Sequence, residues 1–250
     1  MLQFTQSGHQ QMDNDAPSAS SLLAGNKPTT EVGRVYNEIF DAVMDRRLLP
    51  GAKLTETTLC TIFTCSRTVI RGALAALAHD KIVNIEVNRG AFVRQPDVKE
   101  TADIFELRRE IECLIIHKLL ALDNLDDHLD HLERMVQRER EAFESGKRIS
   151  WIRLSNAFHV EMTKILQNDV LTELMHTLCA RSTLIIAYQN IAGEHACSFF
   201  EHQEILDLLR ARNRTGALQA MQHHLEACEK RPSNTSAKPD PWQAFSIQRS

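Results

Sequence analysis

The sequence predicts a mainly α-helical protein of two domains, in which a small unit of three helices and a β-hairpin precedes an all-α helical bundle. Length is the first indication, because 250 residues suit two small domains better than one compact core. Composition is the second: 43% hydrophobic and 25% charged residues are ordinary for a globular chain, and only 6% aromatic residues favours helix over sheet. The third is the spacing of apolar residues, which is helical over most of the chain.

The two ends of the chain lack this spacing. Residues 1–27 are polar and rich in Ser and Gln, and we expect a disordered arm there and a flexible tail over residues 233–250. The sequence shows no secretory leader and no apolar run of ~18 residues, which predicts a cytoplasmic protein without a membrane segment. Its six cysteines are scattered, with no C-x-x-C pair, as is typical of reduced residues.

The predicted N-terminal domain covers residues 28–97 and begins with one long helix. Apolar residues recur at three- and four-residue spacing from about Thr30 to Arg47. The helix should end before Leu49-Pro50-Gly51, because a proline disfavours helix in the residue before it and a glycine suits a turn. Two shorter helices should follow, with Thr55 and Ser66 as their N-caps.

A small β-hairpin closes this domain. Residues 82–87 and 91–93 are rich in β-forming side chains, and the turn-compatible triplet Asn88-Arg89-Gly90 separates them. Three helices followed by a hairpin describe a winged helix-turn-helix. In that fold the third helix enters the major groove of DNA, and the hairpin, called the wing, contacts the backbone or the minor groove.

The second predicted domain, residues 98–232, shows no convincing strand. Its amphipathic runs are separated by turn-tolerant residues such as Asp123-Asn124 and Ser145-Gly146. No repeat period relates the runs, so a helical bundle fits better than a solenoid. The six expected helices cover residues 98–122, 126–146, 149–167, 169–191, 194–212 and 214–230.

Motifs in both domains resemble a known family. The stretch LPGAKLTETTLCTIFTCSRTVIRGALAALAHDKIVNIEVNRGAFV is similar to the DNA-binding domain of the GntR family of bacterial transcription regulators. The motif IFELRREIE and the C-terminal histidine pattern resemble the FCD effector domain of its FadR subfamily. This chain has Thr64, Val69 and Gly72 where the family usually has Gly, Pro and Glu. The resemblance implies a transcription regulator whose operator affinity is controlled by a small metabolite, such as an organic acid.

The resemblance also implies which residues contact DNA. The positions on the third helix and the wing are Ser66, Arg67, Thr68, Arg71, Arg89 and Gly90. Helical phase independently places Thr68, Gly72 and Ala75 opposite the buried Ile70, with the two helix arginines on the flank. Arginine suits guanine or phosphate, although both arginines can equally be solvated surface charges.

Charge and symmetry bear on the DNA partner. The net charge of −4 gives no global attraction to nucleic acid, whereas residues 30–95 hold nine Lys/Arg against seven Asp/Glu. DNA binding must therefore come from a local surface. Winged helices that read two-fold half-sites of a double-stranded operator need paired copies, which predicts a homodimer.

Three histidines face the interior of the predicted bundle. His159, His202 and His224 follow apolar stripes on three separate helices, whereas His223 lies among polar neighbours. Three inward imidazoles can converge on one divalent metal ion, and Zn²⁺ or Ni²⁺ is the most suitable. The alternative for each is a core histidine hydrogen-bonded to a neighbouring side chain.

The resemblance extends to this pattern, with one departure. FCD domains usually carry an acidic or amide ligand four residues before the first histidine, where this chain has Ser155. Either a water replaces the missing side chain, or Asn156 adapts, or the site has lost its metal and binds effector directly. Ser155, Asn156 and Arg108 are thus candidate effector-binding residues. Arg108 lies among apolar residues and needs a partner, which is either Glu112 one turn later or a carboxylate of the effector. The charged run from Glu133 to Glu144 is expected to be a solvated helix face.

Two other classes of function remain open at this point. Three imidazoles with an open position are also typical of a metal-dependent hydrolase or lyase. However, no Asp or Glu lies at motif spacing from His159 to act as a base, and neither G-x-S-x-G nor a phosphate-binding glycine loop occurs. An architectural nucleic-acid binder is disfavoured by the negative charge and the inward histidines. The sequence therefore favours a regulator that is not an enzyme.

Overall fold

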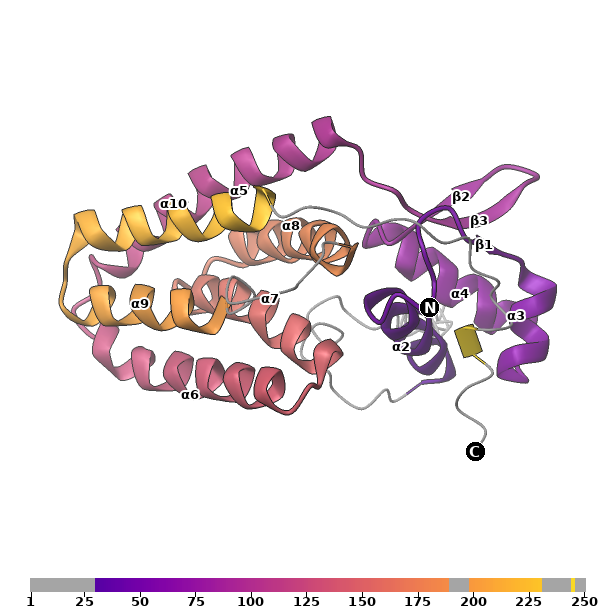
Figure 1. Ribbon diagram of the computed structural model, residues 1–250, viewed down its shortest axis with the longest axis horizontal. Helices are drawn as coiled ribbons and strands as arrows, with labels where there is room; N and C mark the ends of the chain where they lie inside the picture. The colour runs from indigo at the N-terminus through magenta and orange to yellow at the C-terminus, as the bar shows by residue number, and fades with distance from the viewer. Residues whose placement is uncertain (1–29, 189–197, 231–243, 246–250) are drawn as a thin grey trace, which may run out of the picture.

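The computed structural model describes residues 30–188, 198–230 and 244–245. The predicted arm at 1–27 lies outside the described residues, as do the adjoining ends of two predicted helices at 189–197 and most of the predicted tail. Within these residues, helices α2, α3 and α4 and a small sheet lie at one end of the molecule, and helices α5 to α10 lie at the other (Figure 1). The predicted fold class is confirmed.

The three N-terminal helices begin at the caps that the sequence predicts. Helix α2 (Glu31–Met44) starts after Thr30, whose Oγ1 accepts a hydrogen bond from the Gly33 N–H at 3.0 Å. Helices α3 (Glu56–Phe63) and α4 (Arg67–His79) start after Thr55 and Ser66, and each cap oxygen accepts a bond from the amide three residues later. The predicted helix-turn-helix is therefore present.

A three-stranded antiparallel sheet completes this domain, in the order β1-β3-β2. The strands are β1 (Lys53–Leu54), β2 (Val83–Glu86) and β3 (Gly90–Val93). Strands β2 and β3 form the predicted hairpin, with Glu86 opposite Gly90. Asn88 and Gly90 adopt φ angles of 61° and 101° at its tip, a region that glycine tolerates freely. No sequence pattern predicts β1, because two residues are too few to show alternation.

Six helices form the second domain, and each overlaps a predicted run. Helix α7 contacts α5, α6 and α8 and so occupies the middle of the bundle. Helix α8 is long and apolar enough to cross a membrane, but 61% of its apolar window is buried inside the protein, as in the core helix of a globular domain. The helices are α5 (Val98–Leu119), α6 (Leu125–Glu144), α7 (Arg148–Ile165), α8 (Asp169–Tyr188), α9 (Ser198–Arg210) and α10 (Arg214–Lys230).

The two domains meet where α2 packs against α7 and α8. The carbonyl oxygen of Ala187, near the end of α8, accepts hydrogen bonds from Arg46 Nε at 2.8 Å and from Arg148 Nη2 at 2.9 Å. The Tyr188 hydroxyl donates to the Leu48 carbonyl oxygen at 3.3 Å. These contacts fix the end of α8 against the segment that follows α2.

Two residues of the expected tail pack on the N-terminal domain. Ala244 is 3% exposed, and its carbonyl oxygen accepts a hydrogen bond from Arg47 Nη1 at 2.6 Å. The ring of Phe245 meets the ring of Phe63 edge-on, with centroids 5.0 Å apart. Residues 244–245 therefore lie against the N-terminal domain, near α2 and α3 in Figure 1.

Candidate metal centre and DNA-binding surface

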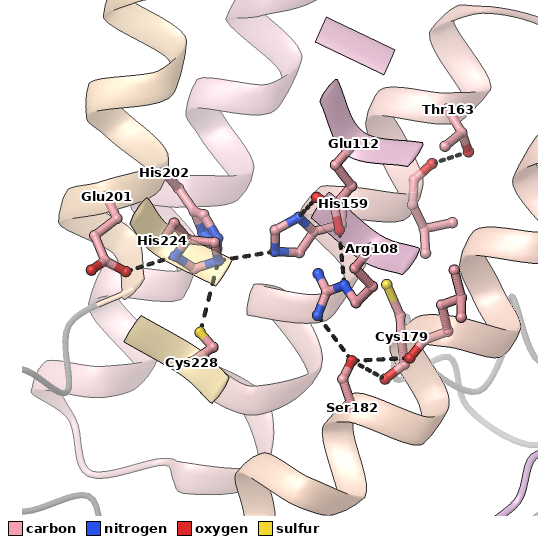
Figure 2. Close-up of polar contacts among 12 residues, drawn as sticks. Arg108, Glu112, His159, Thr163, Cys179, Ser182, Glu201, His202, His224 and Cys228 are labelled. Carbon is pink, nitrogen blue, oxygen red and sulfur yellow. Dashed lines mark hydrogen bonds and ion pairs between the residues drawn. The ribbon is translucent and has the colours of Figure 1, made fainter. Parts of the chain in front are cut away.

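Three imidazoles from three helices meet inside the bundle. His159 of α7, His202 of α9 and His224 of α10 are each at most 2% exposed, and one ligand nitrogen from each lies within 4.8 Å of the others. The Nε2 atom of His224 lies 3.3 Å from Nε2 of His202 and 3.3 Å from Nε2 of His159 (Figure 2). The exposed His223 is not part of this cluster.

Each imidazole is held by a carboxylate at its other nitrogen. An ionised carboxylate only accepts hydrogen bonds, so an imidazole beside one would present its Nδ1–H to the carboxylate and its Nε2 lone pair to the centre. The three Nδ1 contacts are His159 with Glu112 Oε2 (2.5 Å), His202 with Glu139 Oε2 (2.8 Å) and His224 with Glu201 Oε2 (2.6 Å).

Electrostatics keep the first of these pairs in the form that metal binding requires. Burial lowers the pKa of His159 to about 4, although Glu112 acts to raise it. Burial alone would raise the pKa of Glu112, but Arg108 and His159 outweigh it and bring that pKa to about 2. At neutral pH His159 is therefore neutral and Glu112 ionised, and a neutral imidazole is the metal-binding form.

Arg108 of α5 is joined to this cluster through Glu112. Its side chain is 1% exposed, its Nε donates to Glu112 Oε1 at 2.8 Å, and its Nη1 donates to Ser182 Oγ at 2.9 Å. The internal pairing with Glu112 is thus present. Among the described residues, Arg108 Nη2 is one of four buried side-chain nitrogens with no hydrogen-bond partner. The guanidinium keeps one donor group available for a ligand.

The two candidate residues before His159 have other partners. The Ser155 hydroxyl donates to Ser198 Oγ at 3.2 Å, and the Asn156 amide nitrogen donates to the Ile152 carbonyl oxygen at 3.0 Å. Ser155 is half-buried and Asn156 is 2% exposed. The structure places both residues on the α7 segment that carries His159.

Glu139 corrects the expectation of a solvated face over residues 133–144. Its side chain is 1% exposed, its Oε1 accepts a hydrogen bond from Ser198 Oγ, and its Oε2 faces His202. Glu139 follows the buried Leu132 and Val136 at helical spacing, which was the available signal. Interpreting the run by its charge alone was wrong for this residue, because a carboxylate can be buried when it has hydrogen-bonding partners.

The predicted DNA-contacting residues of α4 lie at its exposed N-terminal end. Ser66, Arg67, Thr68 and Arg71 are all exposed, and Ser66 Oγ caps the helix through the Val69 amide at 3.3 Å. The first turn of α4 is thus open to solvent. A helix N-terminus with exposed donors is suited to phosphate contact.

Two of the predicted arginines are engaged within the protein. Arg71 Nε donates to Glu56 Oε1 on α3 at 2.8 Å, in an exposed ion pair. Arg89, beside Gly90 at the tip of the wing, pairs with Glu86 and lies 5.5 Å from the ring centroid of Phe92. Each of these arginines is thus paired with a carboxylate of its own domain.

The expected outward position of Gly72 is wrong. Gly72 is half-buried, and a Cβ atom at that position would lie 3.2 Å from Cγ2 of Val32 on α2. Helix α2 covers the side of α4 that carries Gly72. Of the three small residues, only Thr68 and Ala75 are therefore exposed. Helical phase alone does not reveal this second neighbour.

Comparison with known families follows the same division of the chain. The family described as "Bacterial regulatory proteins, gntR family" matches residues 31–93, from α2 through β3. The description "FCD domain" matches residues 103–227, which contain the histidine cluster. The chain belongs to the GntR family. It is a helix-turn-helix transcription regulator with an FCD domain, and not an enzyme.

Relatives of this GntR regulator cover nearly the same length. It is 26% identical over 211 residues to the HTH-type transcriptional regulator YdhC of Bacillus subtilis (strain 168), covering 82% of this chain and 92% of the relative. It is 25% identical over 201 residues to a protein of Paenarthrobacter nicotinovorans named a probable D-xylose utilization operon transcriptional repressor, covering 80% and 87%. A crystal structure of a GntR regulator from Rhodococcus sp. RHA1 aligns with TM-score 0.68 and 26% identity, covering 80% of this chain and 96% of that one.

Sequence reasoning missed the carboxylates that orient the histidines. It named Glu112 only as a partner of Arg108, and it did not single out Glu139 or Glu201. Glu201 directly precedes His202 in the sequence yet binds His224 of the next helix, a contact that only the packing of α9 on α10 creates. Pairing across helices leaves no local sequence signal.

Proposed function

We propose that this GntR regulator binds a two-fold operator as a homodimer in the cytoplasm, and that a divalent metal ion and an anionic metabolite in its FCD domain control its operator affinity. One observation carries the proposal. Three buried imidazoles turn their Nε2 atoms toward one another, with that of His224 3.3 Å from those of His202 and His159, and each has a carboxylate at its opposite nitrogen.

Two lone pairs at this distance repel unless a positive group lies between them. A proton shared between two Nε2 atoms would require an imidazolium, which burial disfavours at His159, whose pKa is about 4. A divalent metal ion meets the requirement directly. Zn–N bonds of about 2.0–2.1 Å at tetrahedral angles place two ligand nitrogens about 3.3 Å apart, close to the spacing observed.

The charges around the cluster fit a divalent cation. Glu112, Glu139 and Glu201 contribute three negative charges, and Arg108 contributes one positive charge. The difference of two is offset by Zn²⁺ or Ni²⁺, the ions that suit nitrogen ligands. When bound, the ion would tie α7, α9 and α10 together at one point.

The effector site is proposed beside the metal, at the unpaired end of Arg108. A buried N–H group without a partner is costly, and a ligand oxygen would satisfy it. A guanidinium recognises a carboxylate best, so the effector is assigned to the organic acids. Ser155 and Asn156, on the same stretch of α7 as His159, are proposed to line this site.

The DNA surface is proposed to consist of the exposed end of α4 and the wing. Ser66, Arg67, Thr68 and Arg71 would enter the major groove or contact its phosphates, and Arg89 and Gly90 would contact the flanking backbone. Two copies related by two-fold symmetry would read the two half-sites. The relative from Paenarthrobacter nicotinovorans is named a repressor, which supports repression here.

The test begins with an operator selected from a random-sequence duplex library. Full-length protein is stripped with a chelator, reloaded with one equivalent of Zn²⁺, and screened against carboxylic acids by thermal shift. We expect a carboxylate that stabilises the loaded protein and changes its operator affinity, and an Arg108→Lys variant that loses the response. A protein that retains no divalent ion and binds operator equally with and without Zn²⁺ would overturn the proposal.

A further inference from the structure

A cysteine lies next to the histidine cluster. Cys228 follows His224 by one turn of α10, is 4% exposed, and places its Sγ 4.0 Å from the His224 Nε2 atom (Figure 2). Residues four apart share one helix face, so the thiol and the imidazole point to the same side of α10. This position gives the cluster a sulfur donor in addition to three nitrogens.

The donor expected on α7 is missing at the same site. Ser155 stands where an FCD domain usually carries a carboxylate or amide, and its hydroxyl is directed to Ser198 Oγ at 3.2 Å. A neutral serine hydroxyl is not among the usual ligands of Zn²⁺, whereas a cysteine thiolate is. Ser155 therefore supplies no usual zinc ligand on α7, whereas Cys228 on α10 has its sulfur 4.0 Å from the His224 Nε2 atom.

We propose that Cys228 is the fourth protein ligand of this metal centre, which makes it a three-histidine, one-cysteine site. The inference rests on the proposed metal centre. On binding, the Cys228 thiol releases its proton to solvent and the thiolate forms the metal–sulfur bond. The metal keeps its charge of two throughout, so no oxidant or reductant is needed.

Ligation requires the Cys228 sulfur to move toward the cluster. With Zn–S near 2.3 Å and Zn–N near 2.0 Å, tetrahedral angles place sulfur and nitrogen about 3.5 Å apart. The observed separation between Cys228 Sγ and His224 Nε2 is 4.0 Å. The sulfur must move toward His159 and His202, which already lie within 4.8 Å of His224 and of each other without it. We assign that movement to a rotation about the Cys228 Cα–Cβ bond.

A fourth protein ligand has two consequences. Thiolate selects Zn²⁺ over hard cations such as Mg²⁺ or Mn²⁺, so this centre is assigned to zinc. Four protein ligands also close a tetrahedral site, as in structural zinc centres, which leaves Arg108 as the group that anchors the effector.

Cobalt spectroscopy of the full-length protein tests the ligand directly. Co²⁺ replaces Zn²⁺ in such sites and gives visible bands when tetrahedral, and a thiolate ligand adds a sulfur-to-cobalt charge-transfer band in the near-ultraviolet. We expect both features when the stripped wild type is titrated with one equivalent of Co²⁺. Cys228→Ser should lose the charge-transfer band and bind Co²⁺ at least about tenfold more weakly.

Two further variants make the result specific. Cys179 of α8 is completely buried and lies near Arg108 in Figure 2, so Cys179→Ser is the matched control and should keep both features. Adding Ser155→Asp to Cys228→Ser should restore Co²⁺ affinity without the charge-transfer band, which also shows that Cys228→Ser has folded.

The outcomes separate this inference from the metal centre itself. One bound Co²⁺ without a charge-transfer band in the wild type would overturn the role of Cys228 and leave the histidine site standing. No bound Co²⁺ in the wild type would overturn the metal centre. A charge-transfer band that persists in Cys228→Ser and disappears in Cys179→Ser would show that the sulfur ligand is Cys179 of α8. That result would contradict the assignment to Cys228.

Discussion

Arg153 of α7 donates a hydrogen bond from Nη2 to Oδ1 of Asp41 on α2, at 2.5 Å. Its guanidinium also lies 4.7 Å from the ring centroid of Phe40, in the core of the DNA-binding domain. His159 follows six residues later on the same helix, about 9 Å along its axis. One helix therefore carries both a histidine of the metal centre and the arginine that rests on the DNA-binding domain.

This relationship predicts that Arg153 transmits the state of the metal centre to the DNA-binding domain. Arg153→Lys and Asp41→Asn should each reduce the change in operator affinity that Zn²⁺ produces, because both weaken the contact between α7 and α2. Arg153 and Asp41 contact each other between α7 and α2, and neither residue belongs to the histidine cluster or to the proposed DNA surface. Zn²⁺ affinity and the operator affinity of the metal-free protein should stay near wild type. Fluorescence anisotropy of a labelled operator measures the operator affinities, and competition with a chromophoric chelator measures the Zn²⁺ affinity.

The control for that experiment is Arg140→Lys, which alters an exposed arginine of α6 that pairs with Glu144. Its response to Zn²⁺ should match the wild type. If Arg153→Lys and Arg140→Lys respond equally, the coupling between the two domains follows another route.

Arg71 should contribute to operator binding despite its pairing with Glu56. Arg71→Ala should weaken binding, and if the contact is to a phosphate, the slope of log affinity against log salt should fall by about one. Glu56→Gln should strengthen binding, because it removes the carboxylate that competes for Arg71. Gel shifts at several salt concentrations test both, with Lys99→Ala on α5 as an exposed control. Unchanged binding by Arg71→Ala would remove it from the DNA surface.

Glu100 should make the stability of the contact between the wing and the helical bundle depend on pH. Its carboxylate accepts hydrogen bonds from Arg94 Nη2 and Arg181 Nη2, both at 2.6 Å. Burial would raise the pKa of Glu100, but Arg181 and Arg94 outweigh it and hold that pKa below the ordinary value of 4.5. The stabilisation is therefore present above the unfolded-state pKa of about 4.3 and is lost as pH falls through the lower folded-state value.

Glu100→Gln should accordingly reduce the free energy of unfolding by about 1–3 kcal/mol at pH 7, because two charged donors lose their partner. The difference from wild type should shrink as pH falls below about 4. Urea titrations at pH 7 and at pH 3.5 measure it. If the difference in the free energy of unfolding stays the same at both pH values, the charge of the Glu100 carboxylate contributes nothing to stability.

Phe245 should stabilise the DNA-binding domain. Phe245→Ala removes the edge-on contact with Phe63, the last residue of α3, and should lower the stability of this domain by about 1 kcal/mol. Phe200→Ala, which truncates a phenylalanine that is 60% exposed on α9, is the matched control. Hydrogen exchange of α3 amides should increase only in the first variant. Equal exchange in both variants would mean that Phe245 does not support α3.

The elements of the fold could be predicted from sequence because their signals are local. Thr55 and Ser66 mark the helix starts in the helix-turn-helix, and apolar spacing marks the bundle helices. The same periodicity distinguished the inward His224 from the outward His223. What lay beyond sequence is contact between helices: Gly72 against Val32, and Glu139 and Glu201 behind the histidines of other helices. Such contacts depend on how the helices pack against one another, and the sequence of a single helix does not show this packing.

The central claim is that His159, His202 and His224 form one metal centre whose occupancy changes operator affinity. The most direct test compares His224→Ala with His223→Ala, which differ by one position on α10, in the operator Kd with and without one equivalent of Zn²⁺. The wild type and His223→Ala should show the same change, within the 5- to 150-fold range typical of coupled sites, whereas His224→Ala should show none. Equal responses of the two variants to Zn²⁺ would contradict the account.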